Sequence, residues 1–85
     1  MTRKELHQAE GKIGQRLRQT RLERSLTQEE LAALAGSKQA VIQKIENGHS
    51  KRPRVLADLA VALEVNPAWL QWGEPYALKH LKDQP

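Results

Sequence analysis

The segment from Thr27 to Gly48 constrains the fold of this chain more than any other part, because two helix starts and two helix stops follow one another within it. Thr27 and Glu30 have the spacing of a capping box, in which each side chain accepts a hydrogen bond from the other residue's backbone N–H. Gly36 suits the left-handed residue that ends a helix, Ser37 offers an N-cap oxygen to the next helix, and Gly48 is placed to end it. We therefore expect two short helices joined by a tight turn.

Three further helices are expected from the spacing of apolar residues and from proline and glycine signals. The first helix of the chain covers residues 13–24. A fourth has Pro53 at its first position, and a fifth begins at Asn66 and Pro67 and ends at Gly73. No segment shows sustained strand alternation, and one Tyr, two Trp and no Phe do not give the aromatic enrichment of a sheet. The sequence therefore predicts an all-α fold.

Helical spacing also assigns side chains to inward and outward faces. The inward positions are Ile13, Leu17, Leu31, Leu34, Ala35, Ile42, Ile45, Leu56, Leu59, Ala60, Leu63 and Trp69. The outward positions of the first helix are Arg16, Arg18 and Glu23, and the chain around Gly11 and Gly14 is expected to fray. The third helix turns small and polar residues outward, which are Ala40, Gln43, Lys44 and Asn47, with Val41 at the flank. This outer face is a candidate functional surface.

Charge and composition narrow the class of partner. The net charge is +4, from fourteen Lys and Arg against ten Asp and Glu. Residues 38–54 carry five basic residues and one acid, whereas residues 55–78 carry acids alone, so one side of the domain suits a polyanion. The chain has no cysteine, and no apolar run approaches the roughly 20 residues of a membrane span. We expect a cytoplasmic protein without membrane contact.

Catalytic and metal chemistry are not indicated by the side chains present. None of the serines has an evident histidine and acid partner, and His7, His49 and His80 are isolated from one another and from any carboxylate pair at ligand spacing. We expect no enzyme activity and no cofactor or metal.

Two short helices joined by a glycine-containing turn, the second of them polar outside, form the arrangement of a DNA-binding helix-turn-helix. A helix about 10–12 Å across fits a major groove about 12 Å wide, where Gln can pair with adenine, Lys can reach guanine and a small residue admits a thymine methyl. The candidate base-reading residues are Gln39, Ala40, Gln43 and Lys44. The flanking cations that we expect to meet phosphates are Lys38, Lys51, Arg52 and Arg54.

A resemblance to a known family supports this interpretation. Its marks are Thr27-Gln28 before Leu31-Ala32, Gly36 in the turn, Ile42 and Ile45 inside, Glu46-Asn47-Gly48, the run Lys51-Arg52-Pro53-Arg54, and Trp69-Leu70. On these residues the chain is similar to the phage repressor and Cro (XRE-type) helix-turn-helix family over roughly residues 13–73. The resemblance implies a compact five-helix, lambda-repressor-like domain that binds double-stranded operator DNA as a two-fold dimer.

The resemblance also implies roles for individual residues. Matching positions in the family anchor a phosphate at Gln28 and read bases at Gln39, Ala40 and Lys44, with Gln43 nearby. Backbone contacts match Asn47, Lys51 and Arg52, and Arg54 matches a position that faces the minor groove. Arg21 and Glu46 match a structural ion pair, to which an exposed surface pair is the alternative.

The chain divides into an N-terminal extension (1–12), a helix-turn-helix domain (13–73) and a tail (74–85). The tail, with Tyr76, Leu78 and Leu81, either adds a short extra helix or serves a partner.

The expected function is that of a nucleoid-associated transcriptional regulator, a repressor that binds a pseudo-palindromic operator as a homodimer. Pro67 and Trp72 are candidates for the dimer surface, and capping of the core is the alternative for Trp72. The rival function is an antitoxin that neutralises a toxin and autoregulates its promoter, and RNA polymerase is another candidate partner.

Overall fold

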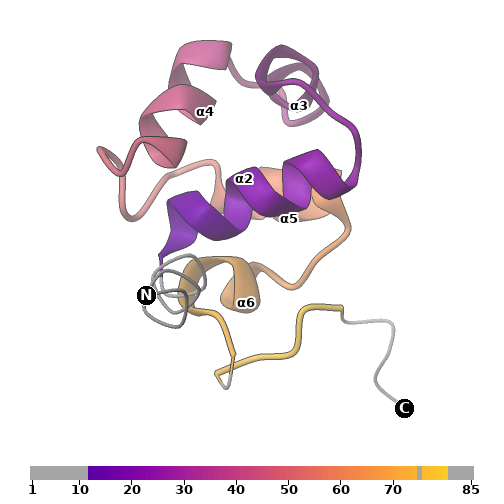
Figure 1. The fold of residues 1–85 in the computed structure, drawn as a ribbon, viewed down its shortest axis with the longest axis vertical. Coiled ribbons are helices and arrows are strands. Elements are labelled where there is room, and N and C mark those ends of the chain that lie inside the picture. Colours follow the sequence, from indigo (N-terminus) through magenta and orange to yellow (C-terminus); the bar gives the residue numbers. More distant parts are fainter. Residues whose placement is uncertain (1–11, 75, 81–85) are drawn as a thin grey trace, which may run out of the picture.

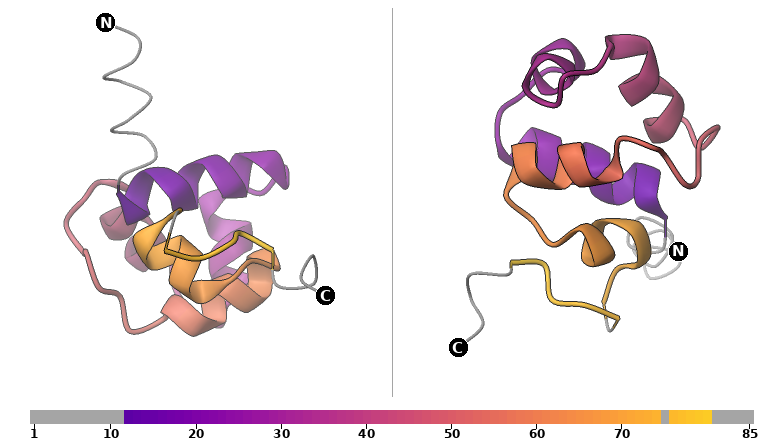
Figure 2. Two further views of the ribbon diagram at one scale, coloured as in Figure 1. Left: turned by 90° about the horizontal axis from the view of Figure 1, so that it is seen from below. Right: turned by 180° about the vertical axis from the view of Figure 1, so that it is seen from behind.

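The computed structural model describes residues 12–74 and 76–80, and within them the chain forms five α-helices (Figure 1). They are α2 (Ile13–Glu23), α3 (Gln28–Leu34), α4 (Gln39–Glu46), α5 (Leu56–Leu63) and α6 (Pro67–Trp72). Helix α2 packs on both α4 and α6, α3 packs on α4 and α5, and α5 packs on α6. In Figures 1 and 2, α3 and α4 lie together at one end of the molecule and α6 lies at the other.

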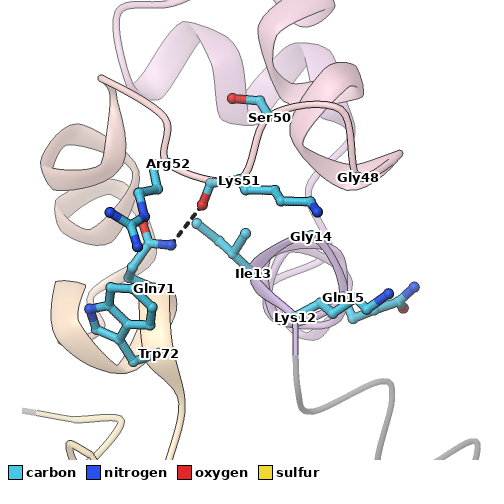
Figure 3. Close-up of a pocket in the computed structure, with 10 residues that line it drawn as sticks. All are labelled: Lys12, Ile13, Gly14, Gln15, Gly48, Ser50, Lys51, Arg52, Gln71 and Trp72. Carbon is cyan, nitrogen blue, oxygen red and sulfur yellow. Dashed lines mark hydrogen bonds between the residues drawn. The ribbon is translucent and has the colours of Figure 1, made fainter.

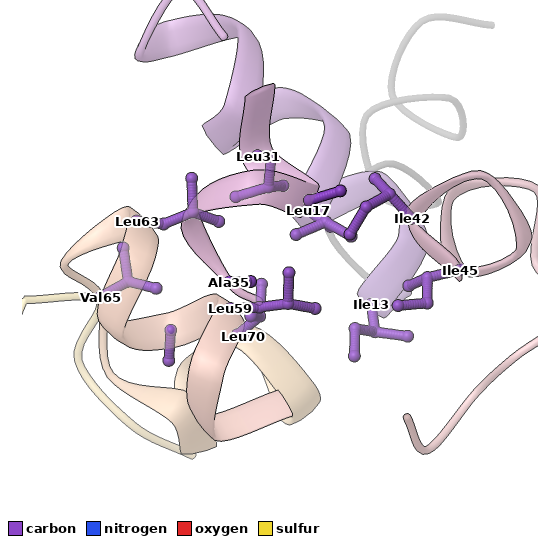
Figure 4. Close-up of a cluster of buried hydrophobic side chains, with 12 residues drawn as sticks. Ile13, Leu17, Leu31, Ala35, Ile42, Ile45, Leu59, Leu63, Val65 and Leu70 are labelled. Atoms are coloured by element: carbon purple, nitrogen blue, oxygen red, sulfur yellow. The ribbon is translucent and has the colours of Figure 1, made fainter. Parts of the chain in front are cut away.

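A single apolar core joins all five helices (Figure 4). Its fully buried side chains include Leu17, Leu31, Ile42, Ile45, Leu59, Leu63 and Leu70. Burying an aliphatic side chain of this size stabilises a fold by about 1.5–3 kcal/mol relative to leaving it exposed. Trp69, which was expected in the core, is half-buried and packs against its edge.

Two helix starts have the predicted caps. The Thr27 hydroxyl accepts from the Glu30 N–H at 3.0 Å, and the Thr27 N–H donates to the Glu30 carboxylate at 2.8 Å, which completes the capping box of α3. The Asn66 side chain accepts from the Ala68 N–H at 2.8 Å, with Pro67 at the first position of α6. Both helices therefore begin where the sequence predicts.

Two other predicted helix starts and one predicted inward position are wrong. The N-cap of α4 is Lys38 instead of Ser37, and its side chain makes no capping hydrogen bond. Helix α5 begins at Leu56, because Pro53 lies one turn earlier, where its carbonyl accepts from the Leu56 N–H at 3.3 Å. In α3 the side chain of Leu34 is 61% exposed and that of Ala32 is buried. A helix of two turns presents only a narrow inward face, and Leu31, Ala32 and Ala35 fill it.

The first turns of α2 also differ from the prediction. Arg16, expected to face water, is only 4% exposed, because its Nε donates to the Leu70 carbonyl at 2.9 Å and its Nη2 donates to the Gln71 carbonyl at 2.6 Å. Burial lowers the pKa of this guanidinium. Gly14, expected to fray, is buried against α4, where an added Cβ would collide with the Ile45 carbonyl oxygen.

Residues 76–80 form no helix and return toward α2 and α6. The Asn66 N–H donates to the Lys79 carbonyl at 2.7 Å. The Lys79 ammonium lies 2.8 Å from a Glu23 carboxylate oxygen and 4.9 Å from the centre of the Trp69 ring. Tyr76 and Leu78 are exposed. The predictions on Leu81, His7 and Gly11 concern positions outside the described residues, so the expected extra helix is untested there.

None of the helices in the described ranges is long and apolar enough to cross a membrane.

Candidate nucleic-acid interface

The outer face of α4 is the surface that the sequence predicts. Ile42 and Ile45 are fully buried and Val41 is half-buried, so these residues hold the helix against α2 and α3. The exposed residues of the helix and its C-cap are Gln39, Ala40, Gln43, Lys44 and Asn47. All four candidate base-reading residues therefore lie on solvent-facing positions of one helix at one end of the molecule.

A hydrogen-bonded chain of side chains leads from the protein interior to this face. The Glu46 carboxylate accepts from Arg21 Nε at 2.7 Å and from Arg21 Nη2 at 3.0 Å. It also accepts from Gln28 Nε2 at 3.1 Å, and the Gln28 Oε1 accepts from Gln39 Nε2 at 3.4 Å. The structure thus joins one candidate base-reading residue to one candidate phosphate anchor and to the ion pair.

The ion pair at the inner end of this chain is buried. The side chains of Arg21 and Glu46 are 9% and 3% exposed, unlike the exposed surface pair that was the alternative. The hydrogen bonds that Arg21 donates to Glu46 raise the pKa of Arg21, and burial opposes this increase. Arg21 also donates to the Leu26 carbonyl at 2.8 Å, so the pair ties α2 and the following turn to the end of α4.

The candidate backbone-contacting cations flank α4 on both sides. Lys38 is exposed at the N-cap of α4, and Lys51, Arg52 and Arg54 are exposed in the loop between α4 and α5. Gln71 Nε2 donates to the Lys51 carbonyl at 2.7 Å, which ties this loop to α6. No sequence pattern predicts this role for Gln71, because its partner lies in a loop with no regular periodicity.

The two candidates for a dimer surface lie at opposite ends of α6. Pro67 is half-buried at its first position, and Trp72 is 50% exposed at its last. The Arg52 guanidinium carbon lies 5.2 Å from the centre of the Trp72 ring, a distance typical of cation–π contact. Half of the Trp72 surface remains open to a partner.

Comparison with known proteins places the chain in a family. Residues 17–70, more than half of the chain, match the family described as Helix-turn-helix. The chain belongs to this family. The identification confirms the predicted XRE-type, repressor- and Cro-like membership, and this is a family of DNA-binding helix-turn-helix regulators, not of enzymes.

Individual relatives agree with the family assignment. The HTH-type transcriptional regulator PrtR of Pseudomonas aeruginosa is 46% identical over 59 residues, which make up 69% of this chain and 23% of PrtR. The chain thus spans less than a quarter of the length of this curated relative. The restriction-modification controller protein C.AhdI of Aeromonas hydrophila has a similar structure, with a TM-score of 0.63 and 37% identity over 68% of this chain and 89% of C.AhdI.

The solution structure of the DNA-binding domain of the P22 C2 repressor is also similar, with a TM-score of 0.68. It is 24% identical and the match covers 76% of this chain and 87% of that domain. This likeness in fold confirms the predicted compact, five-helix, lambda-repressor-like domain.

Proposed function

We propose that this chain is a transcriptional repressor that binds a pseudo-palindromic operator as a homodimer. The α4 helix of each protomer enters a major groove, and the two grooves lie about 34 Å apart along the duplex. Repression follows because the bound dimer blocks access to a promoter. The observation that carries the proposal is the solvent-facing polar face of α4, set between cations at Lys38 and in the loop at 51–54.

The proposal divides the surface into residues that read bases and residues that meet the DNA backbone. Gln39, Ala40, Gln43 and Lys44 read base edges in the major groove. Gln28, Lys38, Asn47, Lys51, Arg52 and Arg54 contact the backbone and fix the position of α4. The hydrogen bond that Gln39 donates to Gln28 supports this division. It holds the Gln39 amide in one orientation in the free protein, so this side chain loses less rotational freedom when DNA binds.

Dimerisation is proposed to use the α6 surface that includes Pro67 and Trp72. A half-exposed tryptophan offers a large rigid contact area, and aromatic residues are enriched at the centres of interfaces. Sedimentation of the free chain, and of the chain on a duplex with two half-sites, tests this part of the proposal. A monomer under both conditions would contradict it.

The division of roles is tested by selecting bound sites from random duplex pools and then measuring three variants on the selected site and on a random duplex. Gln39→Ala and Lys44→Ala are expected to change base preference at particular positions and to lose about 1–3 kcal/mol on the selected site. Lys51→Ala is expected to weaken binding to both duplexes alike and to lower the salt dependence by about one phosphate per protomer. Equal loss on both duplexes for all three variants would refute the assignment.

A further inference from the structure

The structure has a pocket of about 350 Å³, and Figure 3 shows the residues that line it. It opens between the start of α2, the loop from α4 to α5, and the last turn of α6. Its volume falls in the range of about 300–1,000 Å³ that is usual for small-molecule sites. None of the four proposed base-reading residues lines it, whereas Lys51, Arg52 and Trp72, which have other roles in the proposed function, do line it.

The lining of this pocket combines a flat apolar wall with positive charge. The Trp72 ring and the Ile13 side chain supply apolar surface, as Figure 3 shows. Three of the lining residues, Lys12, Lys51 and Arg52, are cations, and none of the described residues in the lining is acidic. Arg52 stacks over the Trp72 ring, so positive charge lies directly beside the aromatic wall. The pocket is therefore complementary to a molecule that is both planar and anionic.

The shape of the pocket is held by contacts within the protein. The hydrogen bond from Gln71 to the Lys51 carbonyl fixes the loop against α6. Gly14 packs so closely on α4 that the start of α2 is fixed as well. A site that exists before its ligand arrives loses little free energy to ordering on binding.

We propose that this pocket binds a small planar aromatic anion, such as an aromatic carboxylate. The ring packs along Trp72 and Ile13, and the carboxylate meets Lys51 and Arg52, whose guanidinium can hold it through two parallel hydrogen bonds. An inorganic anion leaves the apolar wall uncovered, and a neutral ring leaves the cations without a counter-charge. Both parts of the ligand are required for tight binding.

Occupancy of the pocket opposes DNA binding, and this consequence rests on the proposed function. Lys51 and Arg52 line the pocket and are also proposed to contact the DNA backbone. A carboxylate that neutralises them removes part of the attraction to phosphates, so an aromatic anion acts as an inducer that releases the protein from DNA.

The site is tested without DNA by titrating the ¹⁵N-labelled chain with 2-naphthoate and recording amide and indole signals. The Trp72 indole N–H and the backbone N–H groups of Gly14, Gly48 and Ser50 are expected to shift together and to saturate. Acetate, the anion without the ring, and 2-naphthalenemethanol, the ring without the charge, are expected to bind at least tenfold more weakly. Shifts confined to other residues, or equal binding of the neutral alcohol, would overturn the proposal.

A matched pair of variants separates the pocket from general charge effects. Lys51→Gln removes a cation from the pocket and is expected to weaken 2-naphthoate at least fivefold. Arg18→Gln removes an exposed cation from α2 outside the pocket and is expected to leave the affinity unchanged. Equal weakening by both variants would contradict a specific site. Unchanged amide spectra of both variants verify that each remains folded.

The coupling is tested with a fluorescent random-sequence duplex, because backbone contacts do not depend on sequence. Saturating 2-naphthoate is expected to weaken duplex binding at least fivefold, whereas 2-naphthalenemethanol leaves it unchanged. Saturable shifts at the pocket with unaltered duplex binding would disprove the inducer role and retain the site. A chain that binds no duplex at all would refute the proposed function, and the titration without DNA would still decide whether the pocket binds the anion.

Discussion

Glu46 connects the stability of the fold to the proposed reading face through one carboxylate. It accepts two hydrogen bonds from Arg21 and one from Gln28, which in turn accepts from Gln39. Hydrogen bonds that involve an ionised group are about twice as strong as neutral ones, and within the protein they are little screened by water. The same side chain therefore fixes the end of α4 and, through one intermediate, the direction of a proposed base contact.

Substitution of Glu46 by alanine is expected to lower the free energy of unfolding by about 3–5 kcal/mol, because it leaves the buried Arg21 charge without its partner. The control is Glu64→Ala, which removes an exposed carboxylate 3.3 Å from Arg24 and is expected to change stability by less than about 1 kcal/mol. Urea unfolding followed by circular dichroism measures both variants. Similar losses for the two would show that burial of the pair contributes little.

Three single residues or pairs show which structural details can be predicted from sequence patterns and which cannot. The Thr27 and Glu30 capping box depends on neighbours three residues apart, and it is present as predicted. Arg16 donates to carbonyls 54 and 55 residues away, and Gly14 is constrained by the α4 backbone, so no local pattern reports either contact. Arginine at an outward helical position favours solvent, and here the carbonyls at the end of α6 compete successfully for it.

The C-terminal end of a helix can be predicted from the sequence where a glycine follows the helix. Gly36 and Gly48, at φ of 67° and 84°, follow α3 and α4 as predicted. Ser25 and Glu64 take the same left-handed conformation after α2 and α5, at φ of 58° and 60°. In these turns the next N–H donates back to the last helical turn, from Leu26 in the first case. Serine and glutamate rarely adopt this conformation, so neither residue marks a helix end in the sequence as glycine does.

The turn between α3 and α4 is expected to depend on backbone conformation alone. An added Cβ at Gly36 meets no atom within 4 Å, so Gly36→Val creates strain without a collision. A left-handed conformation is unfavourable by about 1–2 kcal/mol for an ordinary residue, and a β-branched residue is strained further. The urea midpoint should fall for Gly36→Val and fall less for Gly36→Asn, because asparagine tolerates this conformation. Equal midpoints for the valine variant and the unmodified chain would contradict this explanation.

At the scale of the whole molecule, the basic loop directly follows the regular helix α4 and has no regular structure of its own. The distribution of charge along the sequence indicated a positive side. Periodicity, together with proline and glycine signals, predicted five helices and most of their faces, with Leu34 and Arg16 as exceptions. The contacts that fix the loop and the residues at 76–80 follow from tertiary packing, since the Gln71 bond to Lys51 and the Lys79 contacts to Glu23 and Trp69 join segments far apart in the chain. The sequence therefore indicated where the proposed interface lies and did not indicate how its loop is held.

The salt dependence of DNA binding tests the charge distribution and the oligomeric state together. Each phosphate neutralised contributes about 0.9 to the slope of log affinity against log salt, so the four proposed backbone cations Lys38, Lys51, Arg52 and Arg54 give about −3.5 for one protomer and about −7 for a dimer. Fluorescence anisotropy on a two-half-site duplex at several salt concentrations measures the slope.

Lys38→Gln should reduce the magnitude of this slope by about 2 on a dimer site, since both copies lose one contact. Arg18→Gln, which removes an exposed cation of α2 that is not among the proposed backbone contacts, should leave it unchanged. A slope near −3.5 on that duplex would contradict the dimer, and a slope near zero would contradict backbone contact by these cations.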